Sequence, residues 1–218
     1  MHVLITGATG FVGTGVLAEA LASPVVGRVT VLGRSSTGVR HAKLSELPVE
    51  DMGDLAPVAD RLTDVDACFW CRGVSSAGMD EATYTRITHD YAMHAARTLA
   101  ERNETLRFCF LSGSGADGSA MWARVKKRTE EDLRSVGLAS LVVFRPAYIR
   151  DRHGARMRGM LYRTAYAIGV LLSPVIRHFG GGTSNAEIGR AMIVAVRDAM
   201  DGDILDSASI NRVAERLE

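Results

Sequence analysis

Three glycines near the start of the chain have the spacing that a phosphate-binding turn requires. Gly7, Gly10 and Gly13 follow directly after a short apolar run with the composition of a β-strand, and a helical pattern comes after them. Glycine lets the backbone turn tightly and lets a pyrophosphate approach the free N–H groups at a helix start. The order of strand, turn and helix therefore predicts a dinucleotide site. We expect contacts from Gly7, Thr9, Gly10, Phe11, Val12 and Gly13.

The residues after the second predicted strand indicate which dinucleotide would bind. An acidic side chain there would suit the ribose hydroxyls of NAD, and this stretch has none. It has Arg34 followed by Ser35 and Ser36. A guanidinium at this position can bind a 2′-phosphate through paired charge-assisted hydrogen bonds, and hydroxyls add donors. We predict that Arg34 and Ser35 select NADP(H); the alternative is that Arg34 is a solvated loop residue.

The overall composition is that of an ordinary globular protein. The chain has 218 residues, of which 47% are hydrophobic and 23% are charged, and its net charge is +1. This length suits one α/β domain, and the charge favours neither nucleic acid nor a membrane surface. We expect no N-terminal targeting signal, because the strand pattern begins at once, and no membrane span, because Arg163, Gly169 and Pro174 interrupt the apolar stretch at 160–176.

The three cysteines do not form a disulfide framework. Cys68 and Cys71 have the C-x-x-C spacing, but they lie in a predicted strand, where residues three apart point to opposite faces. We therefore expect two buried thiols rather than a metal or redox pair, and no metal site elsewhere. Reduced thiols favour a cytoplasmic protein.

Strands and helices alternate along most of the chain. This alternation predicts a Rossmann-like, doubly wound parallel sheet with helices on both faces. We expect strands at Val3–Thr6, Arg28–Leu32, His41–Leu47, Asp66–Cys71, Arg107–Leu111 and Ala139–Phe144. We expect helices at Phe11–Ala22, Asp54–Leu62, Asp80–Asn103 and Ala120–Val136. The whole chain, 1–218, is then one nucleotide-binding domain in which 151–218 adds a small helical cap, built from 157–172 and 185–200, over the carboxyl ends of the strands.

With these elements in place, the chain resembles the short-chain dehydrogenase/reductase superfamily in its atypical and extended branches, which include epimerase-like proteins. Besides the glycine turn and Arg34, the resemblance rests on the stretches 50–52, 67–73, 107–117 and 144–147. The serine loop with Gly-Ala-Asp and the Phe-Arg-Pro turn are most similar to the Tat-interacting protein subgroup. The resemblance implies cofactor contacts from Asp51, Met52, Cys71, Arg72, Gly73, Lys126 and Pro146.

Enzymes of this superfamily carry Tyr-x-x-x-Lys on one helix face. The tyrosine exchanges the proton that accompanies hydride transfer, and the lysine binds the nicotinamide ribose and lowers the tyrosine pKa. Here Lys126 is present, but Trp122 occupies the tyrosine position. An indole N–H donates a hydrogen bond but cannot exchange a proton near neutral pH. Trp122 could stack on a ligand or simply fill the site, and Lys126 could bind the ribose or lie on the surface.

The serine that polarises a substrate carbonyl in the superfamily has two candidates here. Ser112 and Ser114 are separated by Gly113, and either could act or could cap the loop. Among replacement proton donors, which also include Tyr84, Tyr91 and Asp117, Tyr148 is the best candidate, but we favour the interpretation that it is an aromatic packed under the cap.

These residues leave three hypotheses open. The first is an NADP-dependent oxidoreductase or epimerase-like enzyme with a non-standard proton donor, acting on a small molecule. The second is a pseudo-enzyme that senses NADPH and acts on a protein partner, and the third is a carrier of an apolar ligand. A homodimer is compatible with each. The basic run Arg124–Arg128 precedes Glu130–Asp132, so we interpret it as a solvated helix face and not a nucleic-acid site.

Overall fold

The computed structural model of the protein describes residues 1–153 and 182–217. Its centre is a parallel sheet of seven strands in the order β3-β2-β1-β4-β5-β6-β9. The strands are β1 His2–Thr6, β2 Arg28–Gly33, β3 Leu44–Pro48, β4 Ala67–Trp70, β5 Arg107–Leu111, β6 Ser140–Arg145 and β9 Ile204–Asp206. This arrangement confirms the predicted Rossmann-like fold.

The central strands are mostly apolar and mostly buried because helices cover both faces of the sheet. Every residue of β1 is buried, and Ile5 pairs with Val31 of β2 on one side and Phe69 of β4 on the other. In an antiparallel sheet with one wet face, alternate residues would be polar. Because β1 lies between β2 and β4, the loop that follows it lies inside the carboxyl edge of the sheet and not at its end.

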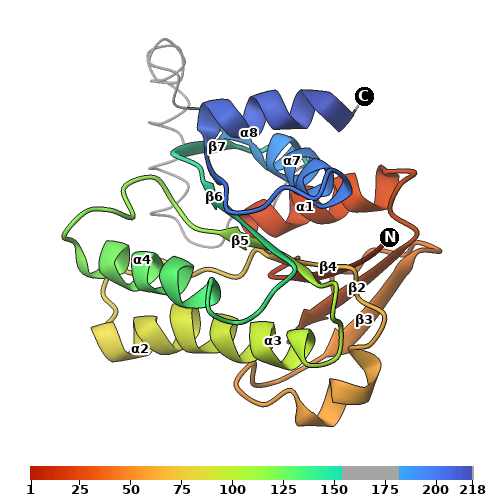
Figure 1. Ribbon diagram of the computed structural model, residues 1–218, viewed down its shortest axis with the longest axis horizontal. Coiled ribbons are helices and arrows are strands. Elements are labelled where there is room, and N and C mark those ends of the chain that lie inside the picture. The colour runs from red at the N-terminus through yellow and green to blue at the C-terminus, as the bar shows by residue number, and fades with distance from the viewer. Residues whose placement is uncertain (154–181, 218) are drawn as a thin grey trace.

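Two helical layers cover the sheet (Figure 1). One layer contains α1 Phe11–Ala22, α7 Asn185–Arg197 and α8 Ser207–Ala214, followed by the short η3 Glu215–Leu217. The other contains η1 Ala56–Arg61, α3 Tyr91–Ala100 and α4 Met121–Leu133. The short helix α2 Glu81–Thr85 and the π-helical turn η2 Arg86–Asp90 lead directly into α3.

The second predicted cap helix has a different place in the structure. Instead of lying over the strand ends, α7 packs beside α1 on the sheet face. The two helices approach closely at glycines: a Cβ on Gly15 would lie 2.6 Å from the Asn185 side chain, and one on Gly189 would lie 3.0 Å from the Val16 Cα. The edge strand β9 follows α7, so this part of the chain completes the sheet. The first predicted cap helix, at 157–172, lies outside the described residues.

Smaller differences concern element ends and two short strands. The third strand begins at Leu44 rather than His41, and the predicted helix at 54–62 is a 3-10 helix at 56–61. The long predicted helix at 80–103 is interrupted by the π-helical turn η2. Strands β7 Tyr148–Arg150 and β8 Gly182–Ser184 form a separate parallel pair that the sequence did not predict.

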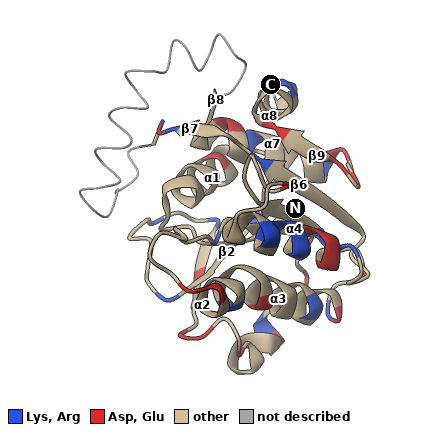
Figure 2. Ribbon diagram, turned by 90° about the vertical axis from the view of Figure 1, so that its left-hand side faces the viewer, with Lys and Arg blue, Asp and Glu red and all other residues tan. Residues whose placement is uncertain are grey.

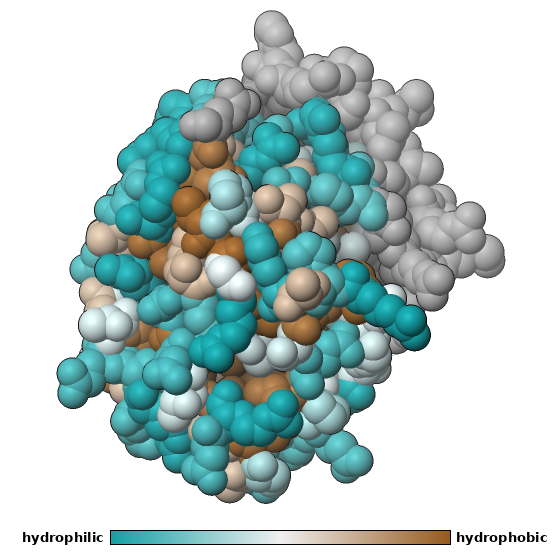
Figure 3. Space-filling model, turned by 90° about the vertical axis from the view of Figure 1, so that its right-hand side faces the viewer, coloured by the Kyte–Doolittle hydropathy of each residue, from teal (hydrophilic) through white to brown (hydrophobic). Residues whose placement is uncertain are grey.

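The described surface is mixed in character. Helix α4 carries both basic and acidic residues (Figure 2), and Arg124 pairs with Glu81 at 2.9 Å while Arg128 pairs with Asp132 at 3.4 Å. On the face seen in Figure 3, apolar side chains form small patches separated by polar ones.

Within the part of the chain that the structure describes, no helix combines the length and apolar character that crossing a membrane would need.

Candidate functional site

The glycine turn between β1 and α1 leaves no room for side chains. Gly7 has φ +69°, and a Cβ on it would lie 2.7 Å from the Cys71 carbonyl oxygen. A Cβ on Gly13 would lie 2.1 Å from the Gly7 carbonyl oxygen. The Gly10 N–H donates to that same oxygen at 2.9 Å, which closes the turn. The sterics of the turn therefore fit the cradle that a pyrophosphate needs.

The start of α1 is open to a ligand. Gly10 is the N-cap, and none of the described side chains caps the helix, so its first N–H groups have no side-chain partner in the part of the chain that the structure describes. Thr9 and Gly10 are exposed, whereas Val12 belongs to the buried core. Asn185, which the sequence did not single out, donates through Nδ2 to the Phe11 carbonyl oxygen at 3.2 Å.

One arginine lies on each side of the glycine turn, the first after β2 and the second after β4. Arg34 and Ser35 follow β2 and are exposed. Arg72 follows β4, and its Cα would lie 2.9 Å from a Cβ on Gly7. Burial lowers the pKa of Arg72, and the positive charge of Arg34 lowers it further. The structure thus brings together two cations that are 38 positions apart in the chain.

Asp51 lies near these arginines in a network of its own. The Gly53 N–H and the Tyr91 hydroxyl donate to the Asp51 carboxylate and lower its pKa, and Arg86 pairs with it at 3.1 Å. Met52, for which the resemblance implied a cofactor contact, has its side chain buried in the core between the sheet and α3.

Helix α4 holds Trp122 and Lys126 one turn apart. The Lys126 ammonium donates to the Leu111 carbonyl oxygen at 3.2 Å and lies 5.6 Å from the centre of the Phe110 ring. Burial lowers its pKa to about 8, partly offset by the negative charge of Glu130. A cation held in such surroundings is typical of a functional site. The half-buried Trp122 ring lies against Gly115.

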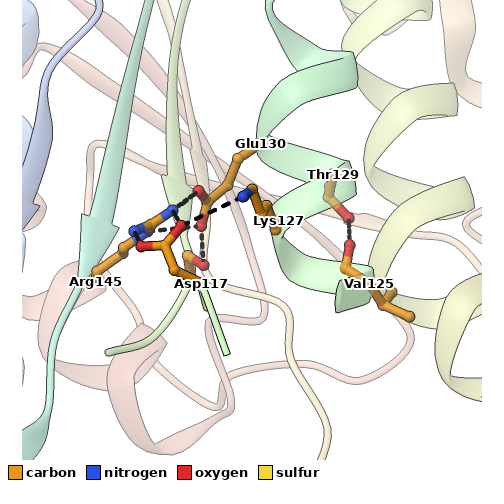
Figure 4. Close-up of polar contacts among 7 residues, drawn as sticks. Asp117, Val125, Lys127, Thr129, Glu130 and Arg145 are labelled. Atoms are coloured by element: carbon orange, nitrogen blue, oxygen red, sulfur yellow. Dashed lines mark hydrogen bonds and ion pairs between the residues drawn. The ribbon is translucent and has the colours of Figure 1, made fainter. Parts of the chain in front are cut away.

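The two predicted serines differ in their surroundings. Ser112 is buried, and its hydroxyl donates to Glu130, a carboxylate that is itself buried. Arg145 also donates to Glu130, through Nε at 3.1 Å, and reaches Asp117 on its other side (Figure 4). The hydroxyl proton of Ser112 is thus committed to Glu130. Ser114 is exposed, and its backbone N–H donates to the Pro146 carbonyl oxygen at 3.0 Å.

The Glu130–Arg145 pair is the main feature of this region that sequence reasoning missed. The only available signal was the four-residue spacing from Lys126 to Glu130, which places both on one face of α4. Tyr148, the alternative proton donor, begins β7, and its hydroxyl oxygen is buried. No group of three or more potential metal-binding side chains occurs among the described residues.

Comparison with known proteins agrees with this geometry. Residues 3–141 match the NAD dependent epimerase/dehydratase family. Protein fmp52, mitochondrial, from Emericella nidulans is 27% identical over 214 residues, covering 93% of this chain and 90% of its own length. Protein HTATIP2 from Rattus norvegicus is 28% identical over 159 residues, covering 71% and 65%. The second match supports the predicted subgroup.

Solved structures show the same fold at lower identity. A UDP-N-acetylglucosamine 4-epimerase from Methanobrevibacter ruminantium superposes with a TM-score of 0.72 and 19% identity, covering 98% of this chain and 80% of that one. A short chain dehydrogenase family protein from Francisella tularensis superposes with a TM-score of 0.68 and 14% identity, covering 97% and 98%.

The expected cytoplasmic location is wrong by this comparison, because the fmp52 relatives from several fungi are named as mitochondrial proteins. The cysteines were weak evidence for a compartment. Cys68, Cys71 and Cys109 are all buried, and burial raises the pKa of Cys71 to about 12. A shielded thiol stays reduced for structural reasons wherever the protein is located.

The glycine turn, the order of the seven strands and the match over residues 3–141 lead to one assignment: the chain belongs to the NAD dependent epimerase/dehydratase family, within the short-chain dehydrogenase/reductase superfamily.

Proposed function

We propose that this protein binds NADP(H) across the carboxyl edge of its sheet and acts as an atypical oxidoreductase or epimerase-like enzyme. The observation that carries the cofactor class is the turn at Gly7 and Gly13, where backbone atoms lie within 3 Å of any added Cβ. The preference for NADP(H) is supported by Arg34, which stands exposed after β2 where an acidic residue would suit NAD.

Each remaining part of the site has a role consistent with this proposal. The N–H groups at the start of α1 would receive the pyrophosphate, and Cys71, Arg72 and Gly73 would border the adenosine. Lys126 would hold the nicotinamide ribose. Bound NADP(H) would supply or accept the hydride.

Fewer side chains near Lys126 can donate or exchange a proton than in typical enzymes of the superfamily. Ser114 is exposed and could donate to a substrate oxygen, whereas the Ser112 hydroxyl is bound to Glu130. Trp122 cannot exchange a proton. If the protein turns over a substrate, another group must supply the proton, and Tyr148 remains our candidate.

Calorimetry with NADPH and NADH on the purified protein tests the cofactor proposal. We expect NADPH to bind at least tenfold more tightly than NADH, and Arg34→Ala to remove that preference. Equal binding of both, unchanged in Arg34→Ala, would contradict the NADP(H) assignment. Binding of neither would contradict dinucleotide binding itself.

A second candidate function is an NADPH sensor that acts through a protein partner. Trp122 at the tyrosine position and the Ser112–Glu130 hydrogen bond favour it, because both remove proton-transfer groups while leaving the glycine turn intact. Trp122→Tyr separates the two candidates, with carbonyl reduction followed as NADPH oxidation. A variant that gains activity from an inactive parent indicates a sensor derived from an enzyme, whereas loss of an existing activity indicates that Trp122 serves catalysis.

A further inference from the structure

Among the residues that the structure describes, half-buried Arg72 has no carboxylate within ion-pair distance. Its guanidinium carbon lies 5.3 Å from the centre of the Tyr91 ring, and its Nε is buried with no hydrogen-bond partner among the described residues. The carboxylate of Asp51 is nearby but is paired with Arg86 at 3.1 Å. A buried Nε–H without an acceptor costs free energy, so this position favours a ligand that supplies an acceptor to the guanidinium.

A second cation, Arg34, also favours binding of an anion near Arg72. Arg34 follows β2 and Arg72 follows β4, and β1 lies between these two strands in the sheet. The backbone of Arg72 also contacts the glycine turn at Gly7. Two guanidinium groups on either side of one turn repel each other, and an anion bound between them would reverse the sign of that interaction.

The Tyr91 ring under Arg72 is positioned by a π-helical turn, a rare secondary-structure element. The π-helical turn η2 is closed by the Tyr91 N–H, which donates to the Arg86 carbonyl oxygen. This turn sets the Arg86 guanidinium carbon 5.7 Å from the centre of the Tyr91 ring. The Tyr91 hydroxyl and Arg86 both bind Asp51. The ring is thereby fixed at its edge and on its face, and π-helical turns are frequent at functional sites.

We propose that Arg72 and Arg34 together bind the 2′-phosphate of NADP(H), and that Tyr91 is the positioning residue that holds the Arg72 guanidinium for this contact. This inference rests on the proposed function. A phosphate monoester presents three acceptor oxygens, and its second pKa is about 6, so at neutral pH it is largely a dianion that two guanidinium groups can match. Arg86 does not join the contact because Asp51 neutralises it.

Two nucleotides that differ only in the 2′-phosphate test this assignment without involving the nicotinamide. They are 2′,5′-ADP and 5′-AMP, and calorimetry gives the ratio of their affinities. We expect the unmodified protein to prefer 2′,5′-ADP, and Arg72→Ala and Arg34→Ala each to reduce that ratio by about 10-fold to 100-fold, the usual effect of losing a hydrogen-bonded charge. Arg134→Ala, which removes an exposed arginine at the end of α4, is the matched control.

Variants of Tyr91 separate positioning from direct contact. Tyr91→Phe keeps the ring under Arg72 and should retain most of the preference for 2′,5′-ADP. Tyr91→Leu removes the ring and should lower the preference, while leaving 5′-AMP binding within about threefold. Thermal melts followed by circular dichroism check that each variant is folded, and Arg72→Gln replaces Arg72→Ala if the latter does not fold.

The outcomes distinguish this inference from the proposed function. If the unmodified protein does not prefer 2′,5′-ADP, the NADP(H) proposal itself fails. If Arg34→Ala removes the preference and Arg72→Ala leaves it intact, only the role of Arg72 is refuted. If Arg72→Ala weakens both nucleotides equally, Arg72 stacks on the adenine instead. If inorganic phosphate alone binds as tightly as 2′,5′-ADP, the site recognises free phosphate and not the nucleotide.

Discussion

Replacing Lys126 with methionine should stabilise the folded protein at pH 7 while weakening cofactor binding. The substitution keeps the length of the side chain and removes the charge. Burial lowers the pKa of Lys126 from its ordinary value of 10.5 to about 8, which means that the folded protein holds this cation at a cost. A site that keeps a destabilising cation favours binding over stability.

The size of the effect follows from linkage. The difference between a pKa of 10.5 and one of about 8 corresponds to about 3 kcal/mol, at about 1.4 kcal/mol for each pH unit. Because the Lys126 side chain keeps partial exposure, we expect about 1 to 2 kcal/mol of stabilisation. For a chain of this length that is a rise in Tm of roughly 2 to 8 °C.

The sign of the pH dependence is also determined. Between pH 8 and 10.5 the unfolded chain binds more protons at this lysine than the folded chain does, so the contribution of Lys126 to the free energy of unfolding rises with pH in that window. The advantage of Lys126→Met should therefore be full at pH 7 and should shrink as the pH rises through this range.

Urea unfolding at several pH values measures the stability difference, and calorimetry with NADPH measures binding. Lys127→Met is the matched control, because Lys127 is exposed and lies 3.9 Å from Asp117, and it should change stability by less than about 0.5 kcal/mol. The chain has three lysines, Lys43, Lys126 and Lys127, so reductive methylation with a ¹³C label gives few resonances to assign. The reasoning is refuted if Lys126→Met is destabilised at pH 7, or if no lysine resonance titrates near pH 8.

Two further substitutions test other parts of the site. Glu130→Ala should lower the free energy of unfolding in urea by about 3 to 5 kcal/mol, since it leaves the mostly buried Arg145 without its main partner. Asp117→Ala should lower it by under about 1 kcal/mol, because the Asp117 carboxylate is 65% exposed. Equal losses for the two variants would contradict the assigned burial. Gly13→Ala should abolish NADPH binding in calorimetry, because its Cβ would lie 2.1 Å from the Gly7 carbonyl oxygen, while Gly27→Ala, whose Cβ has its nearest neighbour at 3.9 Å, should bind normally. Normal binding by Gly13→Ala would show that the turn is not the cofactor cradle.

Features that depend on neighbours in the chain could be predicted from the sequence. The strand at His2–Thr6, the turn beginning at Gly7 and the helix at Phe11–Ala22 follow from apolar runs, backbone freedom and helical periodicity, which are properties of a few consecutive residues. The alternation of such segments restricts the fold to a parallel sheet, because a parallel pair needs a crossover and crossovers are right-handed.

Features that depend on packing between distant segments could not be predicted in this way. Periodicity shows that the helix at 185–197 has an apolar face, but not that this face meets α1 and the sheet instead of the strand ends. The same limit applies to side chains in the site. Ser112 is available for catalysis in the sequence and bound to Glu130 in the structure, a contact across 18 residues that depends on how α4 packs against β5.

By itself the sequence determined the strand–turn–helix unit, the class of cofactor that such a unit suits and the presence of Lys126 and Trp122 one turn apart. Only the tertiary structure decided which polar groups remain available. It placed Arg72 over Tyr91 and within electrostatic reach of Arg34, and it committed Ser112 to a buried carboxylate. The physical reason is that burial and charge depend on every segment packed around a group, whereas turn and helix formation depend on local backbone geometry.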